Sequence, residues 1–195
     1  AGDPYRLKVD TQPVANRTGD ELVTAPVVKV YDRWDNPVTA HDSIEVGVSI
    51  TPNTGQDAGT VFAKQGASTS VRFTDGQATF TGLLVNAKPN VDYALTFDVI
   101  DGPSLLSATS TLFRVSPGAA HHIGVVSQPI GGVTGKLLSV QPVVNVYDID
   151  GNLVTNAGEV CVTASIPTGV SGAHFTDANG AEINTNPSAC SSNGV

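Results

Sequence analysis

Apolar and polar residues alternate in short runs along the first 115 residues, with turn-forming residues between the runs. A period of two is typical of strands with one buried face, and no stretch combines helical periodicity with end caps. Turns are expected at residues 32–37 and 75–76, where Asp, Asn, Pro and Gly gather. The pattern predicts seven or eight strands, near residues 5–11, 24–32, 43–51, 60–63, 70–74, 77–84, 92–100 and 109–115.

The alternation returns later in the chain as a repeat. Residues 5–39 align without a gap on residues 121–155, at a constant offset of 116, and 15 of these 35 positions are identical. Residues 44–50 and 160–166 continue the common pattern before the loop lengths diverge. Self-similarity of this extent indicates two homologous modules.

The repeat predicts an all-β chain of two tandem antiparallel β-sandwiches, at residues 1–116 and 117–195. Residues 192–195 fall where 74–77 lie in the first module, so the counterpart of residues 78–115 is missing and the second sandwich lacks its C-terminal strands. We expect the natural chain to continue or another chain to supply these strands. The sequence contains no Met, so a processed product or a fragment is expected.

The first module and its boundary contain a set of recognisable motifs. They are Leu7-x-Val9-x-x-Gln12-Pro13, Thr18-Gly19, Pro26-Val27-Val28-x-Val30-x-Asp32-x-x-x-Asn36-x-Val38-Thr39, Gly76-Gln77-Ala78-Thr79-Phe80-x-Gly82-Leu83, Tyr93-x-Leu95-x-Phe97 and Ser116-Pro117-Gly118-Ala119-Ala120. These motifs resemble the tandem bacterial immunoglobulin-like repeats (Big-type) of secreted or surface-anchored, adhesin-like proteins. The resemblance implies an immunoglobulin-like fold for both modules, an extracellular or cell-surface location, and no catalytic residues.

Cys161 and Cys190 are the two cysteines of the chain, and Glu45 occupies the position of Cys161 in the first module. Because an extracellular setting favours oxidation, we expect a disulfide between them. The alternative is two free, buried thiols. A zinc site is disfavoured because two thiols provide half of a ligand set.

A weaker candidate is a calcium site. Asp148, Asp150, Asn152 and Glu159 imitate the ligand spacing of a calcium loop. Leu153 stands where such a loop needs Gly for its sharp turn, so a plain turn between two strands is the favoured interpretation.

Trp34, the lone Trp, lies in the first module's corresponding turn and is the best candidate for a binding contact. The alternative is that it folds over the end of the sandwich. No enzyme is expected, because His41, His121, His122 and His174 lie in no nucleophile motif and Asp98 and Asp101 have the pattern of solvated turn residues. No catalytic residue, metal or cofactor is therefore assigned.

Charge and hydropathy exclude two classes of partner. The net charge of −8 and the scattered Lys and Arg argue against nucleic acid. No apolar run approaches the roughly 20 residues of a membrane helix, so no membrane insertion is expected.

The favoured function is a non-catalytic spacer in an extracellular or cell-surface array, with neighbouring repeats of the same or another chain as partners. The alternatives are a glycan- or protein-binding module and an accessory region of a larger secreted enzyme.

Overall fold

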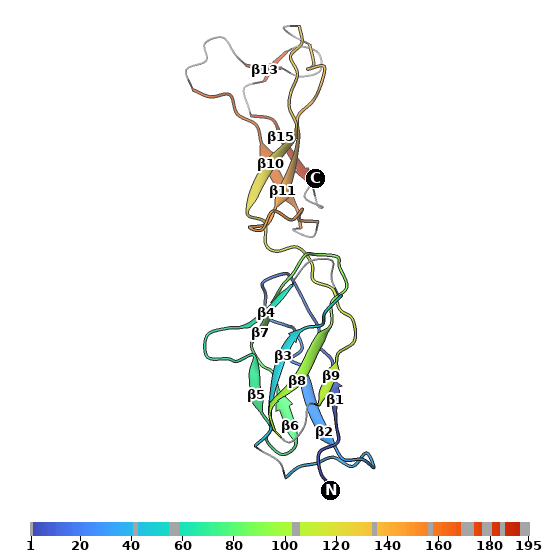
Figure 1. The fold of residues 1–195 in the computed structure, drawn as a ribbon. Coiled ribbons are helices and arrows are strands. Elements are labelled where there is room, and N and C mark those ends of the chain that lie inside the picture. Colours follow the sequence, from blue (N-terminus) through green and yellow to red (C-terminus); the bar gives the residue numbers. More distant parts are fainter. Residues whose placement is uncertain are drawn as a thin grey trace. The chain divides into compact units, whose positions relative to one another are not determined.

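The computed structural model describes residues 2–40, 43–54, 59–102, 106–133, 136–155, 158–168, 174–176, 181–183 and 186–191. These residues form an all-β structure whose strands pair antiparallel (Figure 1). The predicted all-β class is thus confirmed. The chain divides into two compact units, residues 1–116 and 117–195. Among the described residues, no helix has the length and apolar character needed to cross a membrane.

The described residues of the first unit form nine strands in three sheets. Their spatial orders are β1 (Arg6–Thr11), β2 (Val27–Tyr31) and β6 (Gln77–Thr79); β5 (Ser70–Arg72), β3 (Glu45–Ile50), β8 (Leu95–Asp101) and β9 (Ser107–Thr109); and β4 (Thr60–Ala63) with β7 (Leu83–Asn86).

One hydrophobic core joins all three sheets of the first unit. Alternate residues point into it, such as Val28 and Val30 from β2 and Leu95 and Phe97 from β8, and each of these four is at most 1% exposed. The rings of Phe80 and Phe97 pack with their centroids 5.1 Å apart. Burying a side chain of this size contributes about 1.5–3 kcal/mol, so this core is the main source of the first unit's stability.

The predicted strand at residues 77–84 is wrong as a single element. It forms β6, which pairs with β2, and β7, which pairs with β4 in another sheet. The chain turns between them at Gly82, whose φ is +71°, and a Cβ there would lie 2.7 Å from the Cβ of Ala67. A backbone with positive φ and no room for a side chain requires glycine, and this turn moves the chain from one sheet to the other.

The last predicted strand of the first unit, at residues 109–115, also differs. The regular strand β9 ends at Thr109. Next in the chain, the Ser110 hydroxyl accepts the Leu95 N–H and donates to the Thr111 carbonyl. A side chain that bonds the nearby backbone competes with the regular ladder, and the following residues keep an isolated bridge between Tyr93 and Phe113.

The second unit begins with the same strand pairing as the first. β10 (His122–Ser127) and β11 (Val143–Tyr147) pair in the register of β1 and β2 displaced by 116 residues, and the register shift between Val9 and Thr11 recurs between Val125 and Ser127. The other pairs are β12 (Val160–Thr163) with β15 (Ser188–Ser191) and β13 (Phe175–Thr176) with β14 (Glu182–Ile183).

Burial is much sparser in the second unit. Val146 and Val154 are the buried apolar side chains among its described residues, whereas their counterparts in the first unit belong to a core of 18 residues. This is the unit for which the sequence predicts that the C-terminal strands are missing. Residues 192–195, on which part of that prediction rested, lie outside the described residues.

Candidate functional site

The turn that follows β2 is organised by the buried carboxylate of Asp32, which is 1% exposed. Its Oδ1 accepts the N–H groups of Trp34 and Asn36, both at 2.9 Å, and its Oδ2 accepts the Gly2 N–H at 2.9 Å and the Asn36 amide at 3.1 Å. The hydrogen bond from the Gly2 N–H is the largest cause that lowers the pKa of Asp32. Desolvation by burial raises this pKa, but the hydrogen bonds from Asn36 and Trp34 lower it further, and the result is a pKa of about 2. The carboxylate therefore works as a charged cap of the turn.

The turn after β11 repeats this arrangement at an offset of 116. Asp148 Oδ1 accepts the N–H groups of Asp150 at 3.0 Å and Asn152 at 2.8 Å, and Oδ2 accepts the Gly118 N–H at 2.9 Å and the Asn152 amide at 3.0 Å. Burial alone would raise the pKa of Asp148, but these four hydrogen bonds together lower it. The Asp and Asn shared by the two repeats thus have a structural role.

The geometry does not support the calcium interpretation of Asp148, Asp150, Asn152 and Glu159. Both Asp148 oxygens already accept two hydrogen bonds each, which uses the lone pairs that a cation would need. Within the described ranges, Glu159 groups with Cys161 and Cys190, and Asp148 and Asp150 belong to no set of three potential ligands with donor atoms within 4.8 Å.

Cys161 and Cys190 form a disulfide, as predicted, with an S–S distance of 2.02 Å. They lie directly opposite each other on β12 and β15, and both are exposed, so the alternative of buried free thiols is wrong. The equivalent cross-strand pair in the first unit is Glu45 on β3 and Arg72 on β5, which form an ion pair at 2.9 Å.

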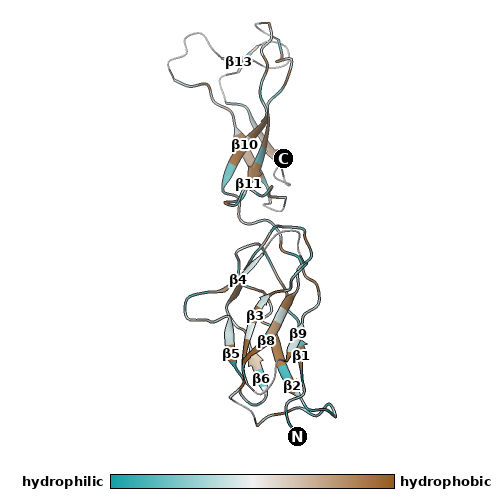
Figure 2. Cartoon of the chain, in the orientation of Figure 1, coloured by the Kyte–Doolittle hydropathy of each residue, from teal (hydrophilic) through white to brown (hydrophobic). Residues whose placement is uncertain are grey.

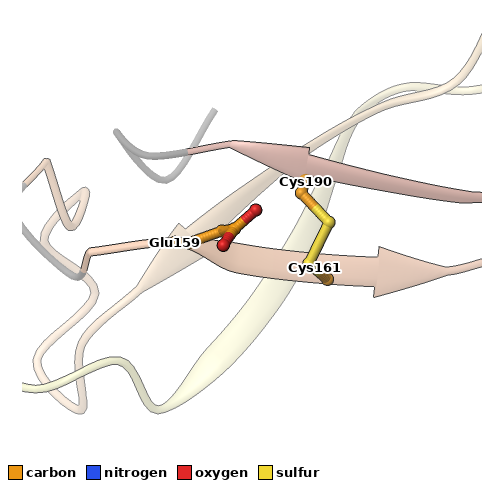
Figure 3. A group of neighbouring side chains, drawn as sticks. All are labelled: Glu159, Cys161 and Cys190. Carbon is orange, nitrogen blue, oxygen red and sulfur yellow. A yellow bond between two sulfur atoms is a disulfide. The ribbon is translucent and has the colours of Figure 1, made fainter.

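The Glu159 side chain lies beside the disulfide (Figure 3). Its carboxylate oxygen and the two sulfur atoms are within 4.8 Å of one another, and all three residues are exposed. Sequence reasoning placed Glu159 in the calcium loop instead. The signal that could have found this neighbour is the two-residue spacing from Cys161, which puts both side chains on one face of an extended chain.

Trp34 is 74% exposed, so the expectation that it folds over the end of the sandwich is wrong. Tyr5 is also exposed, at 53%, and the Arg33 guanidinium lies 5.6 Å from the centre of its ring. Large exposed aromatic side chains are common anchors of protein and sugar contacts. This turn is therefore the best binding candidate in the first unit.

The histidines remain outside any cluster of potential metal ligands in the part of the chain that the structure describes. The rings of His121 and His122 meet edge to face, with their centroids 5.7 Å apart. His122 stacks on Tyr147 at 5.5 Å, while His174 is exposed and His41 lies outside the described residues.

Of the two carboxylates noted in the sequence, Asp101 accepts a hydrogen bond from Arg72 at 3.2 Å. It pairs with Glu45 in the ladder of β3 and β8, whereas Asp98 pairs with Gly47 there. Both residues therefore lie in a sheet strand, and the Asp101 carboxylate bonds to Arg72 of β5, which lies beyond β3 in the same sheet.

Comparison with protein families, with curated proteins and with solved structures finds no match to this chain.

Proposed function

We propose that the chain consists of two tandem immunoglobulin-like β-sandwich repeats that act as a non-catalytic spacer in an extracellular or cell-surface, adhesin-like protein. The observation that carries the proposal is the common framework of the two units. The strand register recurs at an offset of 116, and four of the five hydrogen bonds to the Asp32 carboxylate recur at Asp148. The exposed side chains of the two turns differ, as those of Trp34 and Asp150 do. A framework repeated beneath variable loops is typical of array modules.

Two further features support a non-catalytic, extracellular role. The buried carboxylates have all their oxygens bonded to the backbone and to Asn side chains, so they are not poised to move protons. The exposed disulfide between Cys161 and Cys190 is suited to an oxidising compartment. These are properties of a scaffold placed outside the reducing cytosol.

The test is a screen of the purified, oxidised chain against generic ester, peptide and glycoside substrates. The proposal expects no turnover above the buffer rate. Turnover that a single point substitution abolishes would overturn it, because such loss would locate a catalytic group within these residues.

A glycan- or protein-binding module is the second candidate, and the exposure of Trp34 and Tyr5 favours it. Because Trp34 is the one Trp of the chain, its emission directly reports binding at this turn. Titration with oligosaccharide mixtures should leave the emission unchanged if the chain is a plain spacer. A saturable blue shift that Tyr5→Ala weakens would support the binding function instead.

A further inference from the structure

In the first unit, strands β2 and β3 each have neighbours on both sides. β2 lies between β1 and β6, and β3 lies between β5 and β8. In the second unit, β11 has β10 as its neighbour and β12 has β15, and the described residues provide no strand on the opposite edge of either. The two edges left open correspond to the places of β6 and β8.

Apolar side chains of the second unit are exposed although their counterparts in the first unit are buried. Leu7 is 6% exposed and Leu22 is 7% exposed, but Ile123 and Leu138, which align with them, are 53% and 39% exposed. Apolar residues line much of β10 and β11 in Figure 2. The second unit therefore presents an uncovered face, defined here as Ile123 and Val125 of β10, Val144 of β11 and Val162 of β12, whose counterparts in the first unit belong to its core or pack against it.

The first unit shows which kind of side chains pair with the strand equivalent to β12. β8 pairs with β3 so that Val99, Phe97 and Leu95 lie opposite Val46, Val48 and Ile50. In the second unit, Val162, Ala164 and Ile166 stand at the positions of Val46, Val48 and Ile50. Val162 and Ile166 are half-buried. Ala164 is smaller than Val48, its counterpart, which lies opposite Phe97 in the first unit.

We propose that the uncovered face binds a strand-forming segment of the same repeat type, of which residues 76–116 are the example in this chain. Such a segment adds one strand along β11, as β6 does along β2, and one along β12, as β8 does along β3. Main-chain hydrogen bonds give affinity, and the alternating apolar side chains give specificity. This inference rests on the repeat framework of the proposed function.

The test uses the oxidised 195-residue chain and a synthetic peptide of residues 76–116, with hydrogen exchange as the measurement. The expected result is at least tenfold slower amide exchange in β11 and β12 on adding the peptide, with exchange in the first unit unchanged. A peptide carrying Leu95→Asp and Phe97→Asp is the matched control, and it should give no protection because both substitutions place charge on the apolar face.

A pair of chain variants locates the contact. Val162→Asp changes a half-buried residue of the uncovered face and should abolish the protection, whereas Thr163→Asp changes its exposed neighbour and should not. If Val162→Asp also loses the slow exchange of β10 in the absence of peptide, Ala164→Asp replaces it as the test variant.

Three results would overturn the inference. These are absence of protection by the wild-type peptide, protection in the first unit instead, and protection of the β11 and β12 edges without peptide, whether that protection depends on chain concentration or not.

The proposed function has a separate failure. If β10 and β11 of the free chain exchange as an unfolded segment would, the repeat framework itself is wrong, whereas slow exchange there with no peptide effect refutes the docking alone.

Discussion

Cys161 and Cys190 face each other across β12 and β15 at the position where the first unit pairs an acid with a base. There Glu45 and Arg72 form an ion pair at 2.9 Å. An exposed ion pair contributes about 0–1 kcal/mol, whereas a disulfide that closes a loop with a sequence separation of 29 contributes roughly 3–4 kcal/mol by restricting the unfolded chain. The stronger link lies in the unit with the smaller core.

We therefore expect the double substitution of Cys161 and Cys190 by Ser to destabilise the second unit by roughly 3 kcal/mol. Hydrogen exchange of β12 and β15 should become fast, and that of β1 to β3 should not change. Arg72→Ser is the control for the first unit and should cost at most about 1 kcal/mol. Equal losses from the two changes would contradict the assignment.

Stability in acid should depend on Asp32. Its pKa of about 2 in the folded chain lies below the ordinary value of 3.8, so the folded state favours the charged form. This contribution is fully present above the unfolded pKa and is lost as the pH falls from about 4 through 2. Asp32→Asn should lower the urea midpoint at pH 7 and reduce the loss between pH 4 and pH 2.

The matched control for this prediction is Asp20→Asn, which removes the same charge at an exposed position outside the turn. It should leave the acid limb of the stability curve unchanged. An unaltered slope in Asp32→Asn would show that the carboxylate does not cap the turn.

Substitutions at two glycines, Gly66 and Gly82, can measure the cost of backbone strain apart from the cost of side-chain overlap. Gly66 has φ +87° with open space around it, and Gly82 has φ +71° with the Ala67 Cβ 2.7 Å from the site of a new Cβ. Gly66→Ala should cost about 1 kcal/mol from strain alone, and Gly82→Ala should cost about 2–4 kcal/mol because overpacking adds to it. Urea denaturation of both variants measures the difference, and equal costs would refute the tight turn between β6 and β7.

Glu159 should slow reduction of the disulfide by anionic thiols. A charge within 4.8 Å of the sulfur atoms repels a second negative charge by about 1 kcal/mol in water. Glu159→Gln should therefore speed reduction by glutathione a few-fold and reduction by the cationic thiol cysteamine less. Glu182→Gln, another exposed acid of the second unit, is the control, and an effect that high salt does not weaken would exclude the electrostatic cause.

The alternating pattern was sufficient to predict the strands whose pairing is regular. The predicted strand at residues 60–63 coincides with β4, and that at 5–11 contains β1. The pattern failed where the chain changes sheets at Gly82 and where the Ser110 hydroxyl replaces a ladder contact. Periodicity records which residues face a core, but it does not record which sheet supplies the core or when a side chain bonds the backbone.

The candidate sites show a similar division. The cysteine count and the expected extracellular setting were sufficient to pair Cys161 with Cys190, because two cysteines allow a single bridge. The exposure of Trp34 and the position of Glu159 beside the sulfur atoms depend on how turns and strand ends are oriented in space. Composition and spacing contain little of that information.

The hydrogen bond from Gly118 to Asp148 also bears on how the chain would respond to mechanical load. The first unit anchors its own end, because the Ser116 N–H bonds to the Asn16 carbonyl at 2.9 Å. The second unit anchors its beginning two residues later, at Gly118. Pro117 is the single residue between these anchors, so little unbonded backbone is available to lengthen there before the hydrogen bonds at Ser116 and Gly118 bear the load.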